Sequence, residues 1–168
     1  MGTRNLTVVK DNTGTTRVAQ YGQWDGYPSY SGIKALEFLR EKINRHNLLA
    51  SLPVVEFIDD QEAEEIWEGF EHDSNDPTKY DLEYPGLTRN TGIDILSAVA
   101  TANASKPLKT IDNSEFAKDT LFCEGMYEVD FSTNKFITTY ADIVVEYDLD
   151  TLPSDEDYLA AFEVKQLV

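Results

Sequence analysis

Acidic side chains at regular spacing are the residues of this sequence that could do the most distinctive chemistry. Glu64 and Glu68 are four residues apart, which on a helix places two carboxylates about 5–6 Å from each other. Glu128–Asp130 and Asp148–Asp150 have the strand spacing, roughly 6.6 Å along one face. A rigid row of such charges imitates a nucleic-acid backbone, which carries one charge per about 3.4 Å of axis on each strand. A solvated surface that only maintains solubility explains the same residues equally simply.

The acids are concentrated in residues 54–90, which hold twelve acidic and two basic residues. Within this stretch we expect an acidic helix-loop segment at about 59–86. We expect a partner to contact seven of its acids together with two aromatic residues from an earlier loop: Glu62, Glu64, Glu65, Glu68, Glu71, Asp73, Asp76, Trp24 and Tyr27. A basic surface that meets such a row releases its counterions, so binding should depend strongly on salt.

The loop Gln20–Pro28 is the second candidate site. Three aromatic residues, two amides and one carboxylate stand there on a glycine-rich backbone, directly after a predicted strand. The alternative to the acidic surface is therefore a pocket for a nucleotide-type anion, or a hydrolase site, lined by Arg4, Arg17, Tyr21, Trp24, Asp25 and Tyr27. In a simpler interpretation, the aromatic side chains of the loop close the open end of the core.

Motifs for metals, cofactors and catalysis are absent from the sequence. Residues 73–76 begin like a calcium loop, but Thr78 replaces the glycine of position six and Tyr84 replaces the glutamate of position twelve. The two histidines lack zinc-site spacing. Cys123 stands in an apolar context, which is typical of a small core residue. We therefore expect no catalytic residue, no metal and no cofactor.

The charge balance excludes some partners. The chain has 168 residues, with 31 acidic and 14 basic ones, and a formal net charge of −17. Residues 1–53 have a small positive net charge, and the rest of the chain is strongly acidic. Such a field repels nucleic acid and anionic lipid and attracts basic proteins. We therefore expect a basic protein partner and no direct contact with nucleic acid; the sequence does not specify an oligomeric state.

Length and hydropathy point to a single domain over residues 1–168 with a genuine core. No window is apolar enough to span a membrane, and the N-terminus lacks the pattern of a secretory signal. A single cysteine excludes an intrachain disulfide. These features predict a cytoplasmic protein that does not bind a membrane.

Two hairpins dominate the expected strands. β-branched runs at 4–10 and 15–21 flank the turn sequence Asp11–Gly14, and runs at 121–131 and 135–140 flank Asn134. A strand at 143–147 should lie beside the second hairpin, and short strands are expected at 53–58 and 108–111. Helical spacing predicts helices at residues 32–49, 59–71, 91–103 and 154–162. The expected class is α+β, an antiparallel sheet of an N-terminal hairpin and a C-terminal hairpin plus strand, packed with three to four helices.

Several segments also resemble a known family. MGTRNLTVV, RVAQYGQWDGYP, SEFAKDTLFCEGMYEVDF and YDLDTLPSDEDYLAAFE are similar to a family of small proteins found in bacteriophages, prophages and some bacteria. The family has no established activity, so the resemblance implies a phage or mobile-element setting rather than roles for residues. Small acidic phage proteins often inhibit host defence nucleases, as anti-CRISPR proteins do.

The leading hypothesis combines the charge with this resemblance. It describes a non-enzymatic, phage-type interaction protein, anti-CRISPR-like, which inhibits a host defence protein. Its acidic face would imitate nucleic acid and occupy the basic, nucleic-acid-binding surface of that protein in the host cytoplasm.

Overall fold

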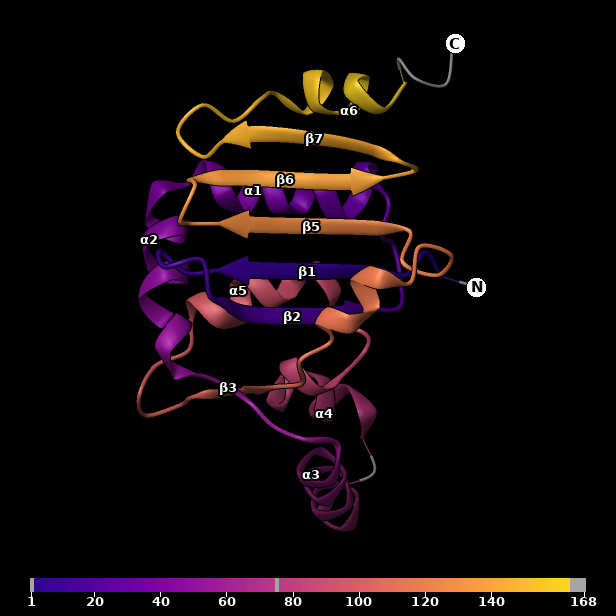
Figure 1. Cartoon of the computed structure of the whole chain (residues 1–168). Helices are drawn as coiled ribbons and strands as arrows, with labels where there is room; N and C mark the ends of the chain where they lie inside the picture. The colour runs from indigo at the N-terminus through magenta and orange to yellow at the C-terminus, as the bar shows by residue number, and fades with distance from the viewer. Residues whose placement is uncertain (1, 75, 164–168) are drawn as a thin grey trace.

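The computed structural model describes residues 2–74 and 76–163 and confirms the α+β class. A five-stranded sheet with the strand order β2-β1-β5-β6-β7 forms its centre (Figure 1). Its strands are β1 (Asn5–Lys10), β2 (Thr16–Gly22), β5 (Gly125–Asp130), β6 (Lys135–Tyr140) and β7 (Ile143–Asp148). Both hairpins and the additional strand expected from the sequence are therefore confirmed.

Local turn chemistry explains why the two hairpins form. The Asp11 carboxylate accepts hydrogen bonds from the backbone N–H groups of Thr13 and Thr15, and Gly14 adopts a positive φ of 85°. Asn134 supplies the left-handed residue of the second hairpin, with φ 58°.

One pairing in the sheet differs from the antiparallel expectation. β1 and β5 run parallel, with Asn5 opposite Gly125, while the β1–β2, β5–β6 and β6–β7 pairs are antiparallel. The long connection after β2 returns the chain to the same end of the sheet, so β5 begins beside the start of β1.

Helices cover one face of this sheet. The structure contains, among the described residues, α1 (Ile33–Arg40), α2 (Lys42–Ser51), α3 (Asp60–Asp73), α4 (Pro77–Glu83), α5 (Ile95–Ala100) and α6 (Asp155–Glu163). In Figure 1, α1 and α5 lie behind the strands, and α6 runs along β7 at the upper edge. Shorter helical turns occupy Pro28–Gly32, Leu52–Val54, Pro85–Leu87, Gly92–Asp94 and Ser114–Lys118.

The helix expected at 32–49 is divided in two at Glu41. The backbone of Glu41 is extended, with φ −80° and ψ 114°. Asn44 donates to the Phe38 carbonyl and Arg45 to the Leu39 carbonyl, so side chains of α2 satisfy carbonyl groups that end α1. This division turns Ile43, which the sequence pattern places on the buried face, out to 61% exposure.

The segment below β2 in Figure 1 forms an arm, which we define as α3 and α4. A two-stranded parallel sheet of β3 (Val55–Phe57) and β4 (Leu108–Thr110) connects it to the rest of the molecule. The prediction of a polar loop after α3 is wrong, because α4 forms within these residues. Asp76 caps this helix by accepting from the Thr78 N–H, and Pro77 occupies its first turn, where no hydrogen bond is lost. Asn75, inside that predicted loop, lies outside the described residues.

The helix expected to begin at a Thr91 cap is also shorter than predicted. Thr91 itself has helical dihedral angles and makes no side-chain capping bond, and a 3₁₀ turn precedes α5. Ile93, Leu96 and Val99 are nevertheless buried, as their spacing predicts. They join the core between α1, α2, α5 and the sheet.

Candidate functional site

Most carboxylates of α3 are exposed. Asp59 caps the helix, its side chain accepting from the Glu62 N–H at 2.8 Å. Glu62 is half-buried and pairs with Lys109 of β4 at 2.9 Å. The other predicted acids of the arm are exposed: Glu64, Glu65, Glu68, Glu71, Asp73 and Asp76. The structure therefore holds six of the seven predicted acids at the surface of the arm.

Four acids of α3 share one side of the helix. Asp60, Glu64, Glu68 and Glu71 are spaced four, four and three residues apart, so they fall within a narrow arc of the helical wheel. We call these four residues the α3 stripe. Within the described residues, none of the four forms an ion pair. Asp60 was not among the predicted site residues, although its spacing from Glu64 is a signal that sequence alone offers.

An aromatic cluster on the side of α3 next to the stripe holds this helix against α4. The rings of Trp67 and Tyr80 meet edge to face, with centroids 4.8 Å apart, and Phe70 lies 5.2 Å from Tyr80. Tyr80 is buried, and burial raises the pKa of its hydroxyl. Trp67 nevertheless stays 39% exposed, because the arm is too thin to cover both sides of the ring.

The two remaining arm acids have local roles as well. Asp73 lies 3.2 Å from Nδ1 of His72, and both side chains are largely exposed. Asp76 caps α4 through the Thr78 N–H, at 3.0 Å. These two acids therefore flank the link between α3 and α4 and stand beyond the stripe.

Of the two predicted aromatic anchors, Trp24 is connected to the arm. Its indole N–H donates to the Asn90 side chain at 2.9 Å, and Asn90 in turn donates to Asp81 of α4 at 3.1 Å. Tyr27 packs instead edge to face with Tyr140 of β6. Sequence reasoning does not find Asn90 because its contact with Trp24 spans 66 residues of chain, and Asp81 joins the connection only through Asn90.

The loop Gln20–Pro28 is held firmly to the end of the sheet. The Tyr127 hydroxyl donates to the Gly26 carbonyl at 2.6 Å, and the Gly26 N–H donates to the Thr3 carbonyl at 3.0 Å. The Ser31 hydroxyl donates to the carbonyl of Asp25 at 2.6 Å, and Asp25 adopts a positive φ of 56°. These contacts fix the backbone of the loop, but the side chains of Trp24 and Tyr27 are 46% and 47% exposed, so they do not close the core as the simpler interpretation expects.

The residues of the alternative pocket are spread over this region. Arg4 lies over the Phe122 ring at 5.1 Å, whereas Arg17 donates to the Leu52 carbonyl at 3.3 Å. Strand register places these two arginines at opposite ends of the β1–β2 hairpin. Tyr21 packs edge to face on Phe116. Trp24 and Asp25 line a hollow of about 60 Å³ with Arg89 and Asn90, a volume that suits a few water molecules.

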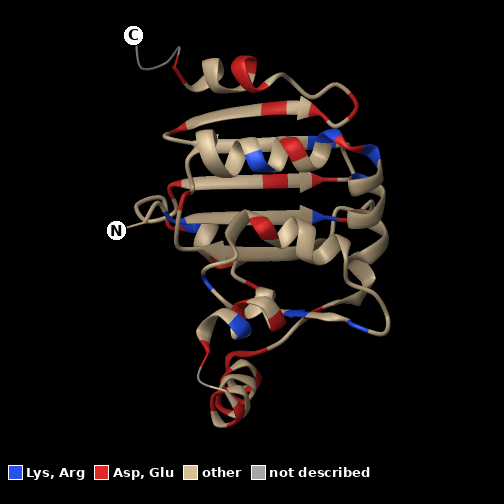
Figure 2. Ribbon diagram, turned by 180° about the vertical axis from the view of Figure 1, so that it is seen from behind, with Lys and Arg blue, Asp and Glu red and all other residues tan. Residues whose placement is uncertain are grey.

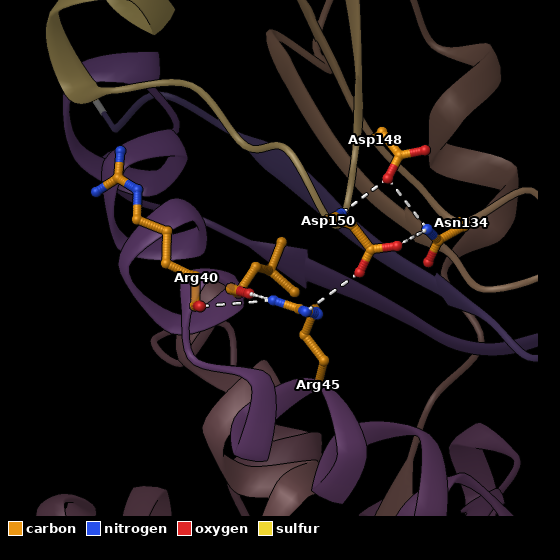
Figure 3. A network of polar contacts seen from close by, with 6 residues as sticks. Arg40, Arg45, Asn134, Asp148 and Asp150 are labelled. Carbon is orange, nitrogen blue, oxygen red and sulfur yellow. Dashed lines mark hydrogen bonds and ion pairs between the residues drawn. The ribbon is translucent and has the colours of Figure 1, made fainter.

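A second acidic region lies at the other end of the molecule, and three of its carboxylates have partners within the chain. Asn134 donates to the carboxylates of Asp148 at 3.2 Å and Asp150 at 3.0 Å (Figure 3). Arg45 pairs with Asp150 at 3.5 Å, and Arg40 pairs with Asp155 at 2.6 Å. We call Asp148, Asp150 and Asp155 with these partners the acidic corner.

The two acidic regions do not merge into one face. Figure 2 shows acidic residues around α3 at the bottom of the molecule and others near β7 and α6 at the top, with the sheet between them. Basic residues of α1 and α2 stand beside the upper group. The positive N-terminal third is thus used in part to neutralise acids of the same chain.

Two further features bear on chemistry. Burial raises the pKa of the Cys123 thiol to about 11, with help from Asp119 and Glu124, so at neutral pH it is a protonated thiol and a poor nucleophile. Over residues 2–74 and 76–163, no group of three or more His, Cys, Asp or Glu side chains could hold a metal ion.

Comparisons with known proteins name no relative of this chain. No protein family matches it, and neither the curated proteins nor the solved structures contain a match. In the part of the chain that the structure describes, no helix has both the length and the apolar character needed to cross a membrane.

Proposed function

We propose that this protein is a non-enzymatic interaction protein whose α3 stripe binds a basic surface of a nucleic-acid-binding protein. The observation that carries the proposal is the contrast in pairing: among the described residues, the stripe carboxylates have no ion-pair partner, while Asp150 and Asp155 of the acidic corner pair with arginines. In line with the resemblance of the sequence, we propose a host defence protein as the partner.

The charge density of α3 supports the choice of a nucleic-acid-binding partner. The helix has 14 residues and is therefore about 21 Å long. Apart from the paired Glu62, it carries six carboxylates: Asp60, Glu64, Glu65, Glu68, Glu71 and Asp73. This is about one charge per 3.5 Å of axis, close to the 3.4 Å of one strand of DNA. These six surround the helix, and a groove that contacts one side of α3 meets the four stripe residues, which lie along about 18 Å and give about one charge per 4.5 Å of axis.

Repulsion among the carboxylates of α3, which destabilises the free helix, also supports a binding role. Like charges at i,i+4, as at Glu64 and Glu68, destabilise a helix by roughly 0.2–0.5 kcal/mol for each pair. The acidic corner shows that this fold can place arginines beside its carboxylates. A basic partner would relieve the repulsion on α3 in the complex.

Affinity capture with charge-matched baits tests the proposal. The wild-type protein, an arm variant E64Q/E68Q/E71Q and a control variant D155N/E156Q/D157N would each be immobilised and exposed to a lysate of the organism that carries the gene. We expect wild type and control to retain nucleic-acid-binding proteins that elute as salt rises between about 50 and 200 mM, and the arm variant to lose them.

Competition with DNA then separates specific mimicry from charge alone. A captured protein should be released from the wild-type bait by DNA of its own binding length, and the wild-type protein should in turn displace that DNA. Equal capture by the arm variant and wild type, or capture that DNA does not disturb, would contradict the proposal.

A further inference from the structure

A shallow groove of about 500 Å³ runs beside the α3 stripe. It lies between α3, α4 and the segment 87–90, and the residues that matter for its chemistry are Glu64, Trp67, Asp81 and Arg89. Tyr80 forms its base and fixes the orientation of the indole. The groove therefore combines an aromatic wall with carboxylates from two different helices.

The Trp67 indole is available to a ligand. An edge-to-face contact with Tyr80 covers at most one face of the indole, and 39% of the Trp67 surface is exposed. An exposed tryptophan face attracts a cation by its quadrupole, with tryptophan the strongest of the aromatic residues in this respect.

The two carboxylates stand where they can accept from such a cation. Glu64 precedes Trp67 by three residues on the same helix, which places their Cβ atoms about 5–6 Å apart. Asp81 comes from α4, and the Asn90 amide fixes its carboxylate at 3.1 Å. Among the described residues, neither Glu64 nor Asp81 has an ion-pair partner.

We infer that this groove binds an arginine side chain of the basic partner, with the guanidinium stacked on Trp67 and hydrogen-bonded to Glu64 and Asp81. A guanidinium fits better than an ammonium, because it is planar, stacks on aromatic faces and pairs with a carboxylate through two parallel hydrogen bonds. The inference rests on the proposed function, since it assigns the chemical group that the arm recognises in its partner.

Substitution of Arg89 should change the affinity for arginine in the opposite direction to substitution of the carboxylates. It lines the same groove and is exposed, so its positive charge opposes the entry of a second guanidinium. Removing the charge with Arg89→Gln should therefore strengthen binding of an arginine ligand, whereas removing either carboxylate should weaken it.

Two octapeptides, one of arginine and one of lysine, are the probes, and titration calorimetry at low salt measures their affinities. We expect wild type to bind the arginine peptide roughly five-fold more tightly than the lysine peptide, as stacking on an exposed ring predicts. Trp67→Leu should abolish this preference, and Arg89→Gln should increase the affinity for arginine two- to three-fold. Glu64→Gln should reduce the preference, whereas the matched Glu71→Gln should weaken both peptides equally.

A second measurement uses a protein that keeps Trp67, so its result does not depend on whether Trp67→Leu folds. In the wild-type protein, the nuclear magnetic resonance signal of the Trp67 indole N–H, one of two tryptophan indole signals, should shift with the arginine peptide and much less with the lysine peptide. Equal affinity of wild type for both peptides, or a preference unchanged in Trp67→Leu, would overturn the arginine site. In that case, if both peptides bound wild type and bound E64Q/E68Q/E71Q more weakly, the proposed function would stand without the arginine site. If neither peptide bound wild type, both the arginine site and the proposed function would be overturned.

Discussion

The acidic corner and the α3 stripe contain similar numbers of carboxylates, but they differ in the side chains that lie beside those carboxylates. In the corner, Arg40, Arg45 and Asn134 lie within hydrogen-bond or ion-pair distance of Asp148, Asp150 and Asp155. On α3, Glu62 is the one acid with a lysine beside it among the described residues, and the stripe faces solvent. The number of acidic residues in a region therefore does not show whether that region can bind a basic partner. Acidic residues that already pair within the chain must first be left out of the count.

The two regions also differ in what holds them in place. The corner is tied to α1 and α2, which pack on the main sheet. The arm has its own small aromatic cluster, and no residue of α3 is buried. We therefore expect the corner to resist local unfolding more strongly than the arm.

Removal of the aromatic ring at the base of the arm should give the largest effect. Tyr80→Ala removes the ring on which Trp67 and Phe70 pack, and we expect a loss of about 3 kcal/mol in the free energy of unfolding of the arm. Hydrogen exchange read by mass spectrometry should show faster exchange in α3 and α4, with β1 and β5 still protected. Unchanged exchange in α3 would mean that other contacts order the arm.

Arg45 should show that the corner is structural. Arg45→Met removes its hydrogen bond to the Leu39 carbonyl at 2.7 Å and its ion pair with Asp150. Because the end of α1 then lacks a charged donor, the free energy of unfolding in urea should fall by about 2 kcal/mol. Lys42→Met, which removes an exposed charge from the same helix, is the control. A loss below about 0.5 kcal/mol for Arg45→Met would remove the structural role that we assign to the corner.

Neutralising one stripe residue should have a small effect of the opposite sign. Glu68→Gln relieves repulsion from Glu64 and Glu71, so stability should rise by roughly 0.2–0.5 kcal/mol in urea unfolding at low salt. The gain should shrink as salt screens the charges. A clear loss of stability would show that Glu68 has a favourable partner, and the stripe would then resemble the corner.

The parts of the fold that sequence predicted are those that local chemistry determines. Both hairpins follow from Asp11, Gly14 and Asn134, which suit tight turns, and α3 follows from its Asp59 cap and its apolar spacing. The acidic residues of the site were predicted for the same reason, because helical spacing alone places Glu64 and Glu68 on one side.

The parts that sequence missed depend on contacts between distant residues. The parallel β1–β5 pair joins strands more than a hundred residues apart, and the division at Glu41 depends on where Asn44 and Arg45 reach back to α1. The polar composition after α3 predicts a loop, although proline after an aspartate cap, as at Pro77, also begins a helix. Trp67 follows a core-like pattern, but the arm offers no second layer to cover it.

We propose that the stripe, and not acidity in general, makes the binding surface. The most direct test is the salt dependence of binding of the arginine octapeptide to E64Q/E68Q/E71Q and to D155N/E156Q/D157N, which carry the same net charge. We predict a lower affinity and a flatter dependence of log K on log salt for the α3 variant, with values near wild type for the α6 variant. Equal losses in the two variants would contradict the account, because they would mean that the peptide responds to total charge rather than to the ordered row on α3.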